Sequence, residues 1–172
     1  LDGVSPGLLD YAKKKGLLPG SASSVENFRA AFSDRFFTFF AHGHERRRTT
    51  AEGLLSEKGN VTEETAMRLL RSHGKHDGDS FTPAGSSMAA VCLHAKGMVT
   101  PSQTTASMVA VLRATGKHSV WMTGSSAPCL SVFKPLYFGA VNPASVLGIP
   151  SASATDKSYF WRHEKLHRSA LL

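Results

Sequence analysis

The sequence predicts an α+β fold in which helices pack on an antiparallel β-sheet. In residues 1–75, apolar side chains recur at helical spacing. In residues 86–140, short apolar stretches rich in β-branched side chains alternate with Gly, Pro, Ser and Thr, which favours antiparallel strands with tight connections. Residues 156–171 are again helical in pattern. Helices on an antiparallel sheet are the usual packing for this order.

The length of 172 residues and the 41% hydrophobic content suit one globular domain, so residues 1–172 are taken as a single domain. No apolar run approaches the roughly 18 residues that a membrane span needs. Two cysteines are too few for a disulfide scaffold. The chain begins with Leu1 instead of Met and has no signal peptide, and we therefore expect a fragment or a processed chain.

Two helices are expected in the first 40 residues. The first covers residues 5–16, with Ser5 as N-cap and Gly16 as the stop. The second opens with the capping box of Ser23 and Glu26 and carries apolar residues at helical spacing. These are Val25, Phe28, Phe32, Phe36, Phe39 and Phe40. We expect this face to pack against the sheet; an aromatic ligand slot or a membrane-lying face is the alternative.

Two further helices precede a polar loop. Residues 46–58 form the first, and Thr62 caps the second, which ends near Gly74. The loop from residue 73 to 85 is rich in Gly, Asp and His. Its candidate metal ligands have spacings that match no standard site. They are His73, His76, Asp77 and Asp79.

Four strands are expected in the second half of the chain. They cover residues 88–95, 103–112, 119–123 and 130–138. Residues 142–154 form a connection rich in Pro, Ser and Ala, after which Asp156 or Ser158 opens the last helix.

The net charge of +7 raises the hypothesis of a nucleic-acid or membrane-surface binder. The basic residues lie in three short groups, at residues 13–15, 46–48 and 162–168. No aromatic residues interleave with them in a nucleic-acid pattern. We therefore predict neither nucleic acid nor a membrane as a partner.

Cys92 and Cys129 both lie in apolar, strand-like stretches. Buried structural thiols are the expected interpretation, and reactive thiols are the alternative. Sequence alone places neither His nor Asp beside them. A reducing compartment, the cytoplasm, fits best.

Residues 163–167 match the H-E-x-x-H pattern of zinc metallopeptidases, in which two histidines bind zinc and the glutamate activates water. A catalytic zinc needs a third ligand, and residues 168–172 contain no His, Asp, Glu or Cys. Flanking Arg162, Lys165 and Arg168 also oppose a dication. An exposed charged helix is the preferred interpretation, and the sequence analysis assigns no metal ligand and no cofactor.

Several strings resemble the secernin branch of the C69 dipeptidase family. They are Val91 to Ala95, Ser102 to Val109, and Trp121 to Pro135, with two helical segments at 5–16 and 160–168. The S-Q-T-T and A-P-C-x-S-x-F-K-P strings are the most specific. The resemblance spans nearly the whole chain in the same order.

The resemblance implies an N-terminal-nucleophile hydrolase, with an αββα sandwich of two antiparallel sheets and dipeptidase activity on small peptides. The family nucleophile is a cysteine at the mature N-terminus, whose α-amine serves as base. Position 1 here is Leu. The resemblance therefore implies an internal fragment that lacks its catalytic residue and is inactive alone. The missing N-terminal half or another protein chain would be its partner.

The strand matching residues 102–109 faces the nucleophile in related amidases, which makes Gln103, Thr104 and Thr105 tentative substrate-binding residues. The alternative is that they are sheet residues whose hydroxyls are internally hydrogen-bonded. Two other functions stay open: a non-catalytic interaction protein on the same scaffold, and a zinc metallopeptidase built on His163, Glu164 and His167.

Overall fold

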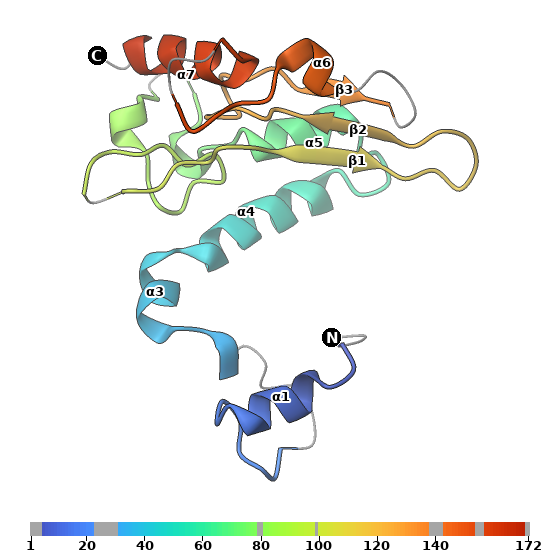
Figure 1. The fold of residues 1–172 in the computed structure, drawn as a ribbon, viewed down its shortest axis with the longest axis vertical. Coiled ribbons are helices and arrows are strands. Elements are labelled where there is room, and N and C mark those ends of the chain that lie inside the picture. The colour runs from blue at the N-terminus through green and yellow to red at the C-terminus, as the bar shows by residue number, and fades with distance from the viewer. Residues whose placement is uncertain are drawn as a thin grey trace. The chain divides into compact units, whose positions relative to one another are not determined.

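The computed structural model describes residues 5–22, 31–78, 81–98, 100–137, 143–153 and 157–170 (Figure 1). The chain divides into two compact units, Leu1–Ala41 and His42–Leu172. Among the helices that the structure describes, none is both long and apolar enough to cross a membrane.

The first unit begins with helix α1 (Leu8–Lys14), which confirms the first predicted helix in a shorter form. Its N-cap is Gly7 instead of Ser5, and Gly7 adopts a positive φ of 81°. Gly16 follows the helix with a φ of 68°, as expected for a glycine stop signal. The small core of this unit includes Ala12 and Leu18.

Helix α3 (Arg35–Phe40) also belongs to the first unit. It begins at Asp34, whose Oδ1 accepts a hydrogen bond from the backbone N of Phe37, so the predicted long helix is interrupted there. Its phenylalanine rings are exposed by 66% at Phe36 and 75% at Phe39. Phe36 contacts Phe40, with ring centroids 4.8 Å apart. Residues 23–30, the start of the predicted helix, lie outside the described residues.

The second unit opens with helices α4 (Gly43–Ser56) and α5 (Glu63–Leu70), which confirm the two predicted helices. The two helices pack closely where Gly53 faces Leu69, because a Cβ at Gly53 would lie 2.3 Å from Leu69 Cδ2. Thr62 caps α5 as predicted. The polar loop that follows contains two 3₁₀ turns, η1 (Gly74–His76) and η2 (Pro83–Gly85).

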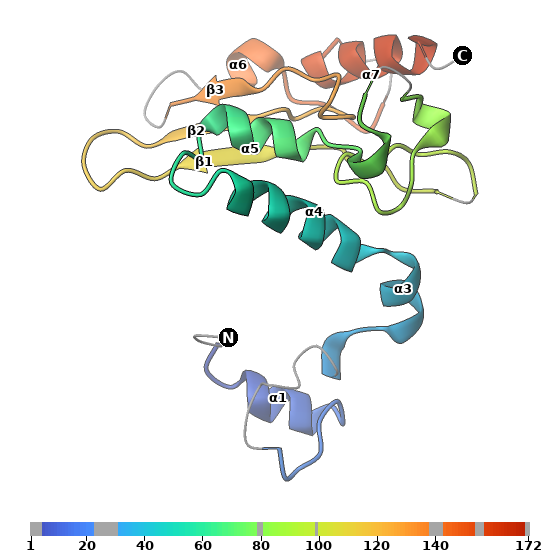
Figure 2. The ribbon, with the colours of Figure 1, turned by 180° about the vertical axis from the view of Figure 1, so that it is seen from behind.

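The sheet of the second unit has three antiparallel strands in the order β1-β2-β3. They are β1 (Met108–Val111), β2 (Ser119–Met122) and β3 (Lys134–Leu136). Trp121 is the central register position, since it pairs with Val109 on one side and Pro135 on the other. Helix α5 contacts β1, and Figure 2 shows α5 in front of the sheet.

The sheet confirms the predicted α+β class, with helices packed on a small antiparallel sheet. Three of the predicted strands form, each shorter than predicted. The prediction of a strand at residues 88–95 is wrong, because this segment consists of turns and irregular backbone. It hydrogen-bonds to several different segments, including Ser72 and Thr104, so its backbone groups are satisfied without a ladder.

The chain ends in two helices. Helix α6 (Pro143–Leu147) lies in the predicted connection and was not expected. Helix α7 (Tyr159–Ala170) confirms the last predicted helix. Two of its residues differ from the predicted exposed charged helix, because Glu164 and His167 are only 2% and 4% exposed.

We predict that Thr62→Ala lowers the free energy of unfolding by about 1 kcal/mol. Thr62 Oγ1 accepts a hydrogen bond from the backbone N of Thr65 at 3.2 Å, and alanine cannot replace this acceptor. Thr62→Ser is the matched control, because serine keeps the hydroxyl. Urea denaturation followed by circular dichroism measures both variants. Equal losses in the two variants would contradict a capping role.

Candidate functional site

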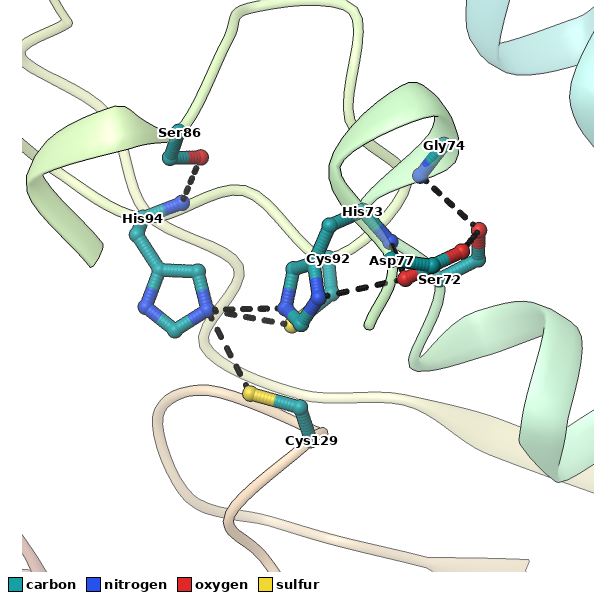
Figure 3. A network of polar contacts seen from close by, with 8 residues as sticks. All are labelled: Ser72, His73, Gly74, Asp77, Ser86, Cys92, His94 and Cys129. Carbon is teal, nitrogen blue, oxygen red and sulfur yellow. Dashed lines mark hydrogen bonds and ion pairs between the residues drawn. The ribbon is translucent and has the colours of Figure 1, made fainter. Parts of the chain in front are cut away.

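Four side chains of the second unit converge on one point (Figure 3). They are His73, Cys92, His94 and Cys129, referred to below as the Cys/His cluster. One ring nitrogen or sulfur from each residue lies within 4.8 Å of the corresponding atoms of the others. Within the described part of the chain, this is the only group of three or more such residues whose ligand atoms come together.

His73 enters the cluster from the end of helix α5. Arg71, two residues earlier, is the C-cap of that helix. The ring of Phe81 stacks on the imidazole of His73, with centroids 3.6 Å apart and planes within 8°. The helix end and this stacking contact together fix the direction of His73.

Cys92 and His94 come from the irregular segment that was predicted as a strand. The backbone N of Cys92 donates to Ser72 O at 2.9 Å, and the backbone N of His94 donates to Ser86 Oγ at 3.3 Å. Both side chains are almost fully buried. These bonds attach the segment to the region just after α5, and so bring Cys92 and His94 beside His73.

Cys129 lies in the connection between β2 and β3. The backbone N atoms of Leu130 and Ser131 both donate to Ala127 O, which closes a tight turn. Ala127 is fully buried and has a φ of 55°, a left-handed conformation that costs a non-glycine residue about 1 kcal/mol. Strained backbone of this kind persists where the surrounding structure holds it.

Arg71 holds this turn in place. Its Nε donates to Pro128 O and its Nη2 to Ser131 O, both at 3.0 Å, so the two bonds lie on either side of Cys129 in the chain. The guanidinium also lies over the ring of Phe133, 4.9 Å from the centroid. Arg71 and His73 leave the same helix end, so one element positions both His73 and Cys129.

Nε2 of His94 is the centre of the cluster. It lies 3.3 Å from His73 Nε2, 3.6 Å from Cys92 Sγ and 3.3 Å from Cys129 Sγ. The Nδ1 of His94 is buried, and it has no hydrogen-bond partner among the residues described.

The pKa values of the two thiols are shifted in opposite directions. Hydrogen bonding from the Cys92 thiol, and then from His94 and His73, lowers the pKa of Cys129 to about 4 despite partial burial. The same bond to Cys129, together with burial, raises the pKa of Cys92.

Asp77 supports the cluster from outside. Its Oδ1 lies 3.3 Å from His73 Nδ1 and accepts a hydrogen bond from the backbone N of His73, while Ser72 Oγ donates to its Oδ2. Partial burial opposes ionisation of Asp77, but the hydrogen bonds from Ser72 and His73 outweigh it and lower the pKa of this carboxyl. The carboxylate favours a proton on His73 Nδ1, which leaves Nε2 with its lone pair toward the cluster.

The strings that carry the family resemblance contact one another around the same place. Thr104 connects the first two: its backbone N donates to Leu93 O, and its Oγ1 accepts from Leu93 N and donates to Val91 O. Thr104 O accepts from the backbone N of Ala127, which connects the third string. The three strings therefore meet near residues 125–131. Helix α7 is a fourth segment that contacts the same residues.

Helix α7 contributes the H-E-x-x-H residues to this contact. Glu164 Oε1 accepts from the backbone N of Ser126 at 3.2 Å, and His163 Nε2 lies 3.0 Å from Ser126 O. Both ring nitrogens of His167 are buried without a partner in the described residues, and burial lowers the pKa of this imidazole. The carboxylate and one imidazole thus bind backbone groups, and the motif does not form a metal-ligand group here.

The tentative substrate-binding residues have different surroundings. The Thr104 hydroxyl accepts one internal hydrogen bond and donates another. This agrees with the alternative interpretation, in which these hydroxyls are internally hydrogen-bonded. Gln103 is half-buried and Thr105 is exposed.

Sequence reasoning did not bring the Cys/His cluster together. It considered His73 and Asp77 with His76 and Asp79, but the side chains of His76 and Asp79 lie outside what is described. His94 and Cys129 are 35 positions apart, which is longer than the spacings of small zinc motifs. The Cys92-x-His94 pair was the one local signal.

Comparison of the chain with protein-family models, curated proteins and solved structures found no match.

We predict that Thr104→Val lowers the free energy of unfolding by about 1–3 kcal/mol, because Leu93 N loses a part-buried acceptor. Thr104→Ser is the matched control and should stay close to the unchanged protein, since it keeps both hydroxyl bonds. Urea titration measures the two. If Thr104→Val were as stable as the serine variant, the structural role given to this hydroxyl would fail.

We predict a similar loss, about 1–3 kcal/mol, for Glu164→Ala, which leaves the buried N–H of Ser126 without an acceptor. Glu164→Gln retains an oxygen at this position and should lose clearly less. Arg168→Ala removes only the exposed partner of Glu164 and should cost about 0–1 kcal/mol. Thermal unfolding of the three variants gives the order, and a glutamine variant as unstable as the alanine variant would contradict the assignment.

Proposed function

We propose that this chain is part of a cysteine-type N-terminal-nucleophile amidohydrolase, similar to the secernins, that hydrolyses small peptides. In this proposal the chain forms a wall of the active site and supplies no nucleophile. The small antiparallel sheet with packed helices is compatible with one half of an αββα sandwich. The proposed location is a reducing one, the cytoplasm, since both cysteines are free.

One observation carries the proposal. The strings that resemble the family are far apart in the sequence, yet Thr104 connects residues 91–95 to the turn at Ala127, and Ser126 connects that turn to α7. The strings and α7 therefore share one hydrogen-bonded network, as segments of one structural unit would. This supports reading them as one inherited structural unit.

The chain's own cysteines are poorly placed for the reaction. An N-terminal-nucleophile mechanism uses the α-amine of the nucleophilic residue itself as the base. Cys92 and Cys129 both lie inside the chain and have no α-amine. In this proposal the nucleophile comes from residues outside this sequence or from another chain.

A wall residue acts on substrate through an exposed side chain. Thr105 is exposed and Gln103 is half-buried, so these two, and not Thr104, are the proposed contacts with the peptide. Loss of such a contact should raise KM with little change in kcat, because it removes binding shared by substrate and transition state.

A second candidate function is an interaction protein on the same scaffold. The exposed phenylalanines of α3 favour it, since large exposed apolar patches commonly mark docking surfaces. This candidate predicts that no form of the protein hydrolyses peptides.

The test begins with the native protein, isolated with an antibody against this chain and sequenced from its N-terminus. We predict an N-terminal cysteine on the native protein or on a chain that copurifies with it. We also predict hydrolysis of dipeptides, measured by mass spectrometry, that disappears when that cysteine is changed to alanine. Thr105→Val should raise KM, and Thr115→Val, at an exposed position in the β1–β2 connection, is the matched control.

Two outcomes would count against the proposal. One is a native assembly without an N-terminal cysteine. The other is an assembly that has one but leaves a broad set of dipeptides intact. The second outcome, with a stable protein partner in the same preparation, would favour the interaction protein.

A further inference from the structure

We propose that His73, Cys92, His94 and Cys129 bind one Zn²⁺ as a tetrahedral Cys₂His₂ site with a structural role. This inference goes beyond the proposed function and does not depend on it. Neither the motifs of the sequence nor the family resemblance assigns such a site. It stands on the positions of four side chains in the second unit (Figure 3).

The three distances from His94 Nε2 to the other ligand atoms are close to those between ligands of one zinc ion. Two nitrogens at about 2.0–2.1 Å from a tetrahedral zinc lie about 3.3 Å apart, and a nitrogen and a sulfur lie about 3.6 Å apart. The structure gives 3.3 Å between the Nε2 atoms of His73 and His94. It gives 3.6 Å and 3.3 Å from His94 Nε2 to the sulfurs of Cys92 and Cys129.

Hydrogen bonding alone does not account for this convergence. An imidazole nitrogen carries either one N–H or one lone pair, so it makes one good hydrogen bond at a time. Three polar atoms nevertheless surround His94 Nε2. A central cation resolves the crowding, because all four atoms then direct a lone pair at the same positive charge.

The surroundings of His73 are those of a metal ligand. Histidines that bind metals usually donate their other ring N–H to a carboxylate or carbonyl, which fixes the tautomer. Asp77 Oδ1 is 3.3 Å from His73 Nδ1, and Ser72 in turn donates to Asp77. Nε2, the nitrogen that remains, is the one that faces the cluster.

The types of ligand atom favour zinc, and the number of protein ligands favours a structural role. Two sulfurs and two imidazole nitrogens in a compact tetrahedral group are typical ligands of Zn²⁺, whereas Mg²⁺ and Ca²⁺ require oxygen. Catalytic zinc sites have three protein ligands and an open position for water. Here the protein supplies all four ligands, so the ion would hold the fold together instead of activating water.

Two metal-free explanations are weaker. A disulfide between Cys92 and Cys129 would leave the approach of His73 and His94 to each other unexplained. A catalytic thiolate–imidazole pair needs one cysteine and one histidine in contact with substrate. Such a pair would leave unexplained why Cys92 and His94, which are 0% and 1% exposed, converge on the same point.

A zinc ion here would connect three parts of the second unit. His73 follows the end of α5, and Cys92 and His94 lie in the irregular segment. Cys129 lies in the connection between β2 and β3. The irregular segment has no strand or helix of its own to stabilise it. Metal binding and folding should therefore be coupled.

The experiment uses the full 172-residue chain, purified under reducing conditions with Zn²⁺ present and then dialysed. Elemental analysis should find about one zinc per chain, as a closed four-ligand site binds one ion. Chelation should lower the melting temperature by about 10 °C or more, since a tightly bound ion stabilises only the folded state. Reconstitution with Co²⁺ should give the visible bands of a tetrahedral complex and a thiolate-to-cobalt charge-transfer band.

Variants separate the proposed ligands from other residues. Cys92→Ser, Cys129→Ser and His94→Asn should each lose the stoichiometric zinc and the thiolate band, or weaken both strongly. His118→Asn is the matched control, because His118 is exposed in the β1–β2 connection. His163→Asn, in the H-E-x-x-H segment, should also keep its metal.

Asp77→Asn tests the positioning role of the carboxylate. It should weaken zinc binding about 10- to 100-fold, measured by competition with a chromophoric chelator. The wild-type visible spectrum of the cobalt form should be retained, because the four ligands are unchanged. Loss of fold stability without a change in zinc affinity would contradict this role.

Three results would overturn the proposal. The first is a folded, reduced chain that takes up neither zinc nor cobalt. The second is stoichiometric zinc in both cysteine variants, which would move the site elsewhere. The third is a zinc complex lost in His163→Asn and kept in Cys129→Ser, which would point to the helical motif. If a variant fails to fold, the presence or absence of the thiolate-to-cobalt band in the unchanged chain still tests the proposal.

Discussion

The turn between β2 and β3 is the constraint on which the rest of the second unit depends. It buries the backbone of residues 125–128, and buried backbone polar groups must find partners. Arg71 satisfies the carbonyls of Pro128 and Ser131, and α7 satisfies Ser126 through Glu164. Each partner comes from a different element, so satisfying one turn fixes the positions of α5 and α7 at once. Cys129 is directed at His94 as a consequence.

A small apolar core makes these polar connections matter more. The described sheet has three short strands, and much of the buried set around it consists of Ser, Thr and His. Hydrogen bonds add only about 0.5–1.5 kcal/mol each to stability, although leaving their groups unpaired costs more. A metal ion bound by four side chains contributes several kcal/mol at a single point. Such a contribution would have its largest effect on the stability of residues 88–95, the segment that lacks regular secondary structure.

The sequence predicted those features that depend on local chemistry. Helices α4 and α5 follow from apolar spacing and from the Thr62 cap, and the strands around Trp121 follow from β-branched residues between turn signals. Residues 88–95 were misread because an apolar stretch looks the same whether it pairs in a ladder or packs irregularly. The Cys/His cluster was missed because its members join three segments, and the local sequence carries no signal of tertiary proximity. The buried side of α7 was missed for a related reason: Glu164 and His167 are polar, and polar residues are expected outside unless a partner is known.

The two proposals are compatible because they use different cysteines. A thiolate bound to zinc shares its lone pair with the metal and is a weaker nucleophile than a free thiolate. If Cys92 and Cys129 hold zinc, neither can attack a peptide, and a cysteine hydrolase must take its nucleophile from elsewhere. That agrees with a mechanism in which the reacting cysteine carries its own α-amine.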